Sequence, residues 1–96
     1  MRGVNATVQS GNVGSRISYG LTEEGVQAVS FDIAVEEKSA RTWVRINVYG
    51  QGLVDVCRER LREGGYVQVV GRLMNRKRRT EIRAEQIVFG GSPEKF

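Results

Sequence analysis

The chain contains no histidine and only one cysteine, Cys57, among its 96 residues. Without histidine it lacks the commonest general base and a common metal ligand, so Ser-His-Asp and Cys-His catalysis are impossible. A single cysteine excludes an intrachain disulfide. No apolar run approaches the roughly 18 residues that would span a membrane, and no apolar secretory segment opens the sequence. We therefore expect a cytoplasmic protein that is not an enzyme, with no cofactor, no bound metal, no membrane association and no small-molecule substrate.

Lysine is also scarce, because only three of the 15 basic residues are lysines and 12 are arginines. The formal net charge is +4. Arginine forks onto phosphates and stacks on bases better than lysine does, and a basic excess favours a polyanionic partner. The length suits one domain with one modest core, which we assign to residues 1–89, followed by a short tail at 90–96.

The segment Thr42–Tyr49 is the most informative in the chain, because a strand there would have two unlike faces. Its even positions, Val44, Ile46 and Val48, are β-branched and suit a core. The other face carries two aromatics, a guanidinium and an amide: Trp43, Arg45, Asn47 and Tyr49. This face suits base stacking and phosphate contact in a binder of single-stranded nucleic acid. The alternative interpretation is that the aromatics pack under a loop or against a partner subunit.

Alternation and breaks in the remaining sequence predict four more strands and one helix. The first strand should bend at Gly11–Gly14. The last strand should contain a bulge near Glu85–Gln86. A short amphipathic helix, on whose apolar side Cys57 lies, should end at Gly64–Gly65. The expected ranges are strands at Val4–Ser18, Gln27–Val35, Thr42–Tyr49, Tyr66–Leu73 and Thr80–Phe89, a charged loop at Glu36–Ala40 and a helix around Leu53–Leu61. This order predicts an all-β, five-stranded Greek-key OB barrel with one helix between the third and fourth strands; an α+β sandwich is the alternative.

A second candidate binding feature is the charge run Asn75–Arg79, at the expected tip of the last hairpin. A basic tip could close over a phosphodiester backbone, although such runs are often only solvated loops. Arg72 and Arg83 face outward on the flanking strands, and Arg16 lies toward the end of the first strand. Together with Arg45 they could form a continuous groove, although each alone could simply be solvated. Gly50-Gln51-Gly52 resembles the start of a dinucleotide-binding fingerprint, but Asp55 replaces the third glycine and no βαβ unit follows.

These segments together resemble the bacterial single-stranded DNA-binding protein family, over roughly Asn5–Phe89. The motifs are Ser10-Gly11-Asn12-Val13-Gly14, Ala28 to Val35, Trp43 to Gly50, Leu61-Arg62-Glu63-Gly64 and Val67 to Leu73. In the family a base-stacking Trp and an aromatic six positions later occupy the third strand, which here are Trp43 and Tyr49. The predicted nucleic-acid-binding residues are Trp43, Arg45, Asn47, Tyr49, Arg72, Arg76, Lys77, Arg78, Arg79 and Arg83.

The resemblance implies sequence-independent binding of single-stranded DNA in replication, recombination and repair, with RNA as a possible ligand. It also implies a homotetramer whose first strands meet across subunits. The sequence departs from the family in three places. The loop Glu36–Ala40 is short and lacks a further stacking aromatic, and the basic hairpin tip is also short and lacks an aromatic. Residues 91–96 lack the long linker and the acidic tip that recruits partner enzymes. A tailless form similar to primosomal replication protein N, a dimeric protein and DNA interaction module of replication restart, is the alternative. An enzyme could arise only through carboxylate-bound metal.

Overall fold

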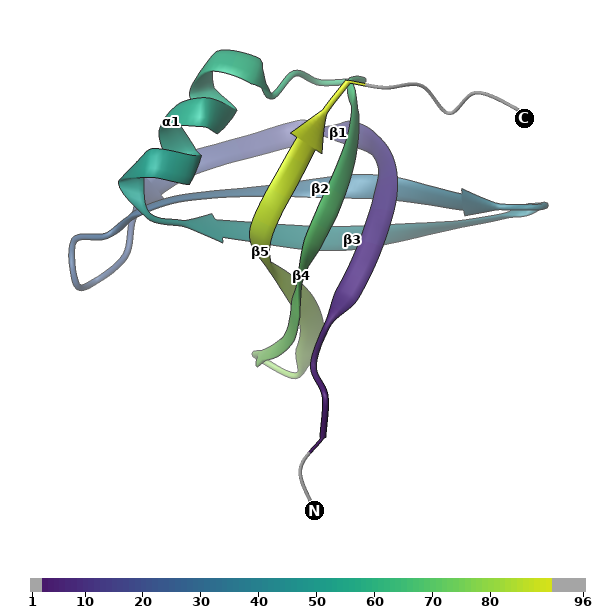
Figure 1. Ribbon diagram of the computed structural model, residues 1–96, viewed down its shortest axis with the longest axis horizontal. Helices are drawn as coiled ribbons and strands as arrows, with labels where there is room; N and C mark the ends of the chain where they lie inside the picture. The colour runs from purple at the N-terminus through teal and green to yellow at the C-terminus, as the bar shows by residue number, and fades with distance from the viewer. Residues whose placement is uncertain (1–2, 91–96) are drawn as a thin grey trace.

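The computed structural model describes residues 3–90, in which five strands and one helix follow one another in the predicted order (Figure 1). The helix lies between the third and fourth strands, as predicted. Each strand carries a run of alternating inward and outward side chains, which is the pattern from which it was predicted. The elements are β1 (Thr7–Leu21), β2 (Gln27–Glu37), β3 (Ala40–Tyr49), α1 (Gln51–Arg60), β4 (Tyr66–Arg76) and β5 (Arg79–Phe89).

The strands form one closed barrel in the order β1-β2-β3-β5-β4, with β3 and β5 parallel and the other neighbours antiparallel. The long β1 closes it, because Thr7–Asn12 pairs with β4 and the part from Asn12 onward pairs with β2. A register shift lies between Val13 and Ile17, close to the predicted bend. At Gly11 the two strands come so close that a Cβ would stand 2.2 Å from the carbonyl oxygen of Ala34. The closed sheet confirms the barrel and excludes the α+β sandwich.

The predicted bulge in the last strand is also present. Val70 pairs with Gln86 and Gly71 pairs with Ala84, so Glu85 is the extra residue of β5. Because a bulge shifts the alternation by one residue, the inward side chains change from even numbers (Ile82, Ala84) to odd numbers. The change of parity in the sequence therefore marked a real feature of the sheet.

The core fills the barrel and is capped at one end by α1. Thirteen apolar side chains within residues 3–90 are buried, and Phe31, Ile33, Ile46 and Val69 are almost wholly inaccessible. Val54 and Cys57 of α1 lie against this core at 0 % exposure, which confirms that Cys57 occupies the apolar side of the helix. Burial of these side chains, at about 1.5–3 kcal/mol each, is the main stabilising contribution.

The helix ends earlier than its glycines predicted. Its last residue is Arg60, and Leu61 already has an extended backbone (φ −77°, ψ 127°) that turns its side chain into the core. Gly64, at φ 82°, instead reverses the chain, and its N–H donates to the carbonyl of Val13. The glycine pair therefore forms the turn that leads into β4 and does not end the helix.

Two other expectations are corrected. The predicted loop Glu36–Ala40 is only a two-residue turn at Lys38–Ser39, since β2 continues to Glu37 and β3 begins at Ala40. The long β2–β3 hairpin extends beyond the barrel, as Figure 1 shows. The alternation in the fourth strand predicts that Leu73 points inward with Val67 and Val69, but Leu73 is 50 % exposed. The reason is that β1 pairs with β4 only as far as Gly71.

No helix within residues 3–90 is long and apolar enough to cross a bilayer. The predicted tail at 90–96 lies, except for Gly90, outside the described residues.

Candidate nucleic-acid interface

On the outer face of the β2–β3 hairpin, the polar side chains of β3 lie beside polar side chains of β2. The antiparallel register places Arg45 opposite Asp32 and Asn47 opposite Ser30. Four open hollows run across this face and share lining residues from one to the next, so they form one groove. The two middle hollows measure about 300 and 320 Å³. We call this series the β2–β3 groove.

Its lining residues come from three parts of the chain. The β1–β2 end contributes Thr22, Glu23 and Glu24 with Tyr49. The β4–β5 hairpin covers the middle, and the far end lies between β1 and Trp43. Among the predicted binding residues, Trp43, Arg45, Asn47, Tyr49, Arg76, Lys77 and Arg79 line the groove.

Trp43 and Tyr49 stand near opposite ends of the groove, about 20 Å apart at the usual rise per residue of a strand. Trp43 is 56 % exposed, so a large part of its indole is open to solvent. Tyr49 is half-buried; its ring lies 5.1 Å from the guanidinium carbon of Arg83, and its hydroxyl accepts a hydrogen bond from Nη1 of Arg76 at 3.2 Å. The hydroxyl bond links the aromatic to the base of the basic hairpin.

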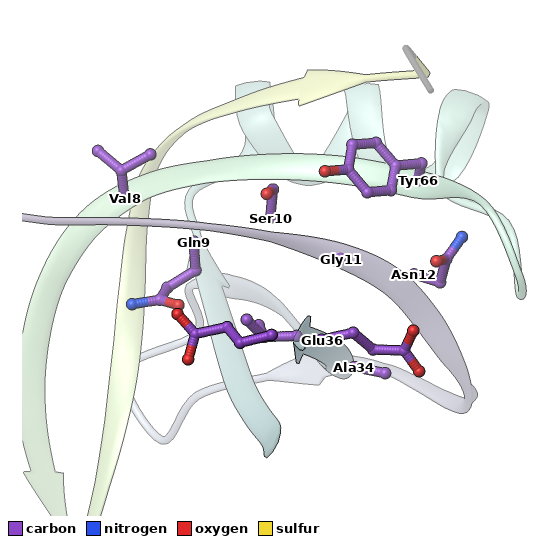
Figure 2. A pocket seen from close by; sticks show the side chains of 10 residues that line it. Val8, Gln9, Ser10, Gly11, Asn12, Ala34, Glu36 and Tyr66 are labelled. Carbon is purple, nitrogen blue, oxygen red and sulfur yellow. The ribbon is translucent and has the colours of Figure 1, made fainter. Parts of the chain in front are cut away.

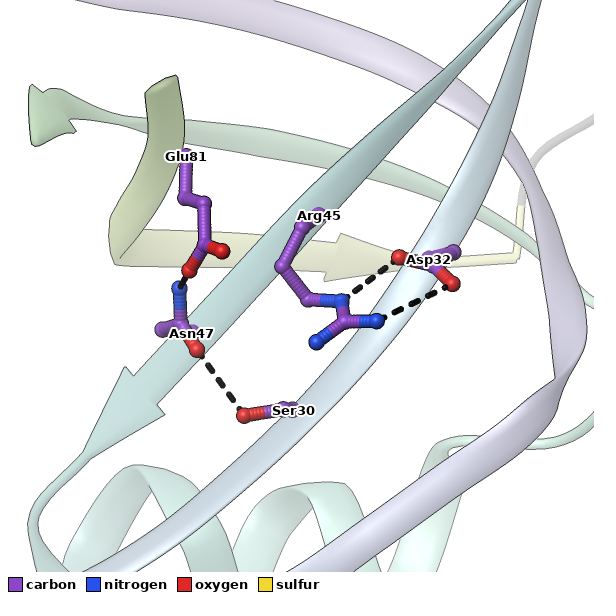
Figure 3. A network of polar contacts seen from close by, with 5 residues as sticks. All are labelled: Ser30, Asp32, Arg45, Asn47 and Glu81. Atoms are coloured by element: carbon purple, nitrogen blue, oxygen red, sulfur yellow. Dashed lines mark hydrogen bonds and ion pairs between the residues drawn. The ribbon is translucent and has the colours of Figure 1, made fainter. Parts of the chain in front are cut away.

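Between the aromatics the floor of the groove holds a network of polar contacts, shown in Figure 3. Nε of Arg45 donates to Oδ1 of Asp32 at 2.6 Å. This bond raises the pKa of the Arg45 guanidinium, against the lowering effect of burial. Arg45 therefore carries a permanent charge that Asp32 partly compensates.

Asn47 is not the exposed amide that its position on β3 predicted, because it is only 2 % exposed. Its Oδ1 accepts from the hydroxyl of Ser30 at 2.8 Å, and its Nδ2 donates to Oε1 of Glu81 at 2.6 Å. Glu81 is also buried, at 7 %. The two partners of Asn47 lie on the strands that flank β3, Ser30 on β2 and Glu81 on β5. The amide therefore links β2, β3 and β5 beneath the tip of the β4–β5 hairpin.

The predicted basic tip at Asn75–Arg79 is a tight turn between the paired strands β4 and β5. Lys77 and Arg78 form the turn with φ angles of 49° and 70°, a left-handed conformation in which glycine and asparagine are the usual residues. Arg76 pairs with Arg79 at its base, so four cations are concentrated at the tip. Three of them line the groove, while Arg78 is exposed outside the four hollows.

Two predicted residues on the flanking strands have other surroundings. Arg72 lies 3.7 Å from the carboxylate of Glu85 and lines none of the four hollows. Arg83 contacts the ring of Tyr49. Arg16, which the sequence placed near the end of the first strand, does line the far end of the groove beside Trp43.

The acidic side chains of the groove floor were missed by the sequence analysis. Neither Asp32 nor Glu81 is among the predicted binding residues, yet both line the groove. A signal existed for Asp32: once the turn is placed at Lys38–Ser39, antiparallel pairing puts it opposite Arg45. No comparable signal existed for Glu81, which reaches Asn47 from a strand 34 residues later.

A separate hollow of about 350 Å³ lies where β1 crosses β2, as Figure 2 shows. It is lined by Ser10, Tyr66, Glu36 and Glu37, among others, and shares no residue with the groove. Its charged lining residues are acidic, so it does not suit a polyanion. The described residues contain no cluster of three or more metal-ligating side chains.

A closed five-stranded barrel with a helix between β3 and β4, and a polar groove across β2–β3, defines an OB-fold protein. The sequence model of the single-strand binding protein family matches residues 4–89, and the chain belongs to that family. No curated protein sequence matches it.

Three solved structures illustrate the likeness. The chain is 28 % identical to the SSB of Plasmodium falciparum, solved in complex with ssDNA, with a TM-score of 0.78 over 93 % of this chain and 96 % of that one. It is 17 % identical to the N-terminal domain of PriB from Thermoanaerobacter tencongensis, solved as a dimer, with a TM-score of 0.75 over 92 % and 98 %. The SSB of Thermus aquaticus is 22 % identical with a TM-score of 0.81; the chain is covered to 97 %, but spans only 43 % of that protein.

Proposed function

We propose that the protein binds single-stranded DNA, without a required sequence, along the β2–β3 groove. The observation that carries the proposal is the groove itself, which has an aromatic side chain near each end and a basic hairpin over its middle. Family membership and the ssDNA complex of the P. falciparum protein support the same function.

Bases and phosphates would contact different parts of the groove. Trp43 and Tyr49 would each stack on a base, a contact that contributes about 1–3 kcal/mol and is open to every base. Arg76, Lys77 and Arg79 would hold phosphates along the rim. In a duplex the base faces are already stacked on one another, so this arrangement favours a single strand. RNA would present similar base faces and remains a second possible ligand.

The other predicted residues have different parts in the proposal. Arg45, already paired with Asp32, would make a weaker phosphate or base contact than an unpaired arginine. Asn47 would act by positioning Glu81 rather than by direct contact, given its burial. Arg83 would support the ring of Tyr49, and the exposed Arg72 and Arg78 would add attraction over longer distances.

The decisive experiment is a titration followed by the fluorescence of Trp43, the single tryptophan. Oligo-dT should quench the fluorescence and a matching duplex should not. Affinity should fall with salt, with a slope of about −0.7 for each phosphate contact on a single strand. No response to either ligand, together with no binding by anisotropy of a labelled oligonucleotide, would refute the proposal.

Alanine variants of the two aromatics test the stacking assignment. Trp43→Ala and Tyr49→Ala should each weaken ssDNA binding about fivefold or more. Tyr66→Ala is the matched aromatic control, because Tyr66 lies at the separate acidic hollow, and its affinity should remain unchanged. Equal affinities for all three variants and the natural chain would contradict the assignment.

We further propose that the protein is a homotetramer assembled through β1, as the resemblance implies, since one barrel offers only a short binding path. Val8 and Val88, on β1 and β5, are 58 % and 49 % exposed and would be covered in such an assembly. Light scattering should report four times the chain mass. Cytoplasmic location and roles in replication, recombination and repair stay predictions.

A dimeric interaction module similar to primosomal replication protein N is the second candidate, favoured by the likeness of fold to the dimeric PriB domain. In that case the groove would also contact protein. A dimer mass combined with weak ssDNA binding would support this alternative over the tetrameric binder. Neither candidate is an enzyme.

A further inference from the structure

We propose that the two ends of the β2–β3 groove differ in charge, so that the backbone of a bound single strand leaves the groove past Trp43 and stops at Tyr49. A phosphate site at Arg16 extends the path beyond Trp43, whereas an acidic loop at Glu23–Glu24 closes the other end. The inference rests on the proposed function, since it adds one phosphate contact and one boundary to the same groove.

The Trp43 end of the groove contains an irregularity of β1. The register leaves residues 14–16 of β1 opposite the single residue Asp32 of β2. Extra residues in one strand of a pair bend that strand and can re-aim a side chain. Residues 14–16 line a hollow of about 190 Å³ together with Asp32 and Trp43, and the side chains of Ser15 and Arg16 are exposed.

Arg16 is suited to a phosphate in this hollow because its charge is not compensated by an ion pair. None of the ion pairs formed within residues 3–90 includes Arg16. The carboxylate in the hollow, that of Asp32, accepts instead from Nε of Arg45 at 2.6 Å. A guanidinium can bind a phosphate through two parallel hydrogen bonds, and the hydroxyl of Ser15 is a further donor. A nucleotide next to the one stacked on Trp43 would therefore place its phosphate here.

The Tyr49 end of the groove has the opposite character, because a loop with two carboxylates borders it. Glu23 and Glu24 line the hollow of about 540 Å³ that Tyr49 also lines, and both side chains are exposed. Neither carboxylate forms an ion pair within the described part of the chain. Two negative charges therefore remain uncompensated where the groove ends.

This acidic loop is held in place by its own hydrogen bonds. The hydroxyl of Thr22 accepts from the backbone N–H of Val26 at 3.1 Å, and the carbonyl of Thr22 accepts from the N–H of Gly25 at 2.9 Å. Gly25 has a φ angle of 84°, in the left-handed region that favours glycine. Glu23 and Glu24 are thus carried by a defined turn.

The charges at the two ends set a boundary for the phosphates. Arg76 and Lys77 border the same hollow as the acidic loop, and they attract phosphates as far as Tyr49. A phosphate beyond Tyr49 would meet both carboxylates, and like charges repel one another over the Debye length of about 8 Å at physiological salt. Beyond Trp43, by contrast, the next phosphate meets Arg16. The strand therefore continues at the Trp43 end.

The test measures affinity for oligo-dT as a function of its length, from about 4 to about 16 nucleotides, the range of site sizes of OB folds. Arg16→Gln should leave the shortest oligonucleotides almost unaffected, because they fill only the groove. It should weaken binding of the longest about threefold, as for the loss of an exposed ion pair, and reduce their salt slope by about 0.7.

Glu23→Gln combined with Glu24→Gln should have the opposite effect. With the acidic boundary removed, the strand can pass Tyr49, so binding should tighten by about threefold for the longest oligonucleotides. The gain should increase with length.

The controls change the net charge equally at exposed residues that line none of the four hollows. They are Arg60→Gln for the first variant, and Glu59→Gln with Glu63→Gln for the second. Any effect of a control on affinity should be the same at every length. All the substituted side chains are exposed, so the barrel should stay folded, which thermal unfolding verifies.

The outcomes separate the inference from the proposed function. If Arg16→Gln matches Arg60→Gln at every length, the phosphate site is wrong. If the gain of the double glutamate variant does not increase with length, the closed end is wrong. Either result leaves single-stranded DNA binding intact. A natural chain that binds no oligonucleotide of the series would overturn the proposed function, and this inference with it.

Discussion

The indole of Trp43 lies directly against Gly14, so that a Cβ at position 14 would stand 3.0 Å from a ring carbon. The two residues come from different strands, β3 and β1. The glycine therefore makes room for the ring on one side and leaves much of it exposed to the groove. The glycine within the predicted bend is thus also a support for the proposed stacking residue.

Gly14→Val should displace the indole without unfolding the barrel, because the backbone of Gly14 lies outside the left-handed region and valine suits a strand. We expect a shifted emission maximum of Trp43 and about fivefold weaker ssDNA binding, equivalent to about 1 kcal/mol of stacking. Gly20→Val is the control for the emission, since a Cβ there meets no atom within 4 Å. Unchanged emission and affinity in Gly14→Val would contradict the contact.

Asp32→Asn should release the guanidinium of Arg45 from its charge partner. Because both side chains are partly exposed, the loss in stability should be small, about 0–1 kcal/mol. Affinity for oligo-dT should rise, and the salt dependence should steepen by about 0.7, as for one more phosphate contact. The control is Glu36→Gln, which frees Arg41 from an ion pair outside the groove. A weaker affinity in Asp32→Asn would mean that the ion pair assists binding.

The β4–β5 turn should become more stable, and bind less well, when its cations are replaced by turn-forming residues. Lys77→Asn with Arg78→Gly suits the two left-handed positions and should raise the free energy of unfolding by about 1 kcal/mol. The loss of two charges should reduce the salt slope on ssDNA by up to about 1.4. Urea unfolding and salt titrations measure the two effects.

Lys38→Gly is the control for this double variant, because Lys38 is also left-handed (φ 52°) but lies in the β2–β3 turn, outside the groove. It should gain stability with little loss of affinity. If the β4–β5 variant kept full affinity and the same salt slope, the basic tip would be only a solvated turn.

Burial raises the pKa of the Cys57 thiol from 9.0 to about 11. Above pH 9 the unfolded chain releases the thiol proton, whereas the folded chain retains it up to about pH 11. The contribution of Cys57 to the free energy of unfolding is therefore complete below pH 9 and is lost as the pH rises through 11. Between pH 8 and 10.5 the free energy of unfolding should fall by about 2 kcal/mol from this group. Cys57→Ala should remove that part of the dependence; an identical fall in both chains would refute it.

The alternation of side chains was enough to predict most of the fold. Val29, Phe31 and Ile33 appear on one face of a strand in the sequence and in the core of the barrel. The parity change near Glu85 predicted the bulge, because an extra residue must exchange the two faces. Leu73 was misassigned because alternation identifies a face of the strand, but not where the neighbouring strand stops covering it.

The candidate site was only partly predictable, for a different reason. The sequence identified Trp43 and Tyr49 through their position on a two-faced strand, and the basic tip through its charge. Asn47 was expected in the open, yet strands from both sides bury it. Its burial depends on Glu81, which no local pattern connects to β3.

The sequence by itself determined which side chains point toward a core and which point away, since that follows from the two-residue period of a strand. It also determined the positive charge and the absence of histidine chemistry. Only the closure of the barrel decided which outward side chains meet: it joined Asp32 to Arg45 and Glu81 to Asn47, and left Arg72 outside the groove. These pairs join residues of different strands, so they depend on register and closure, which a local pattern cannot specify.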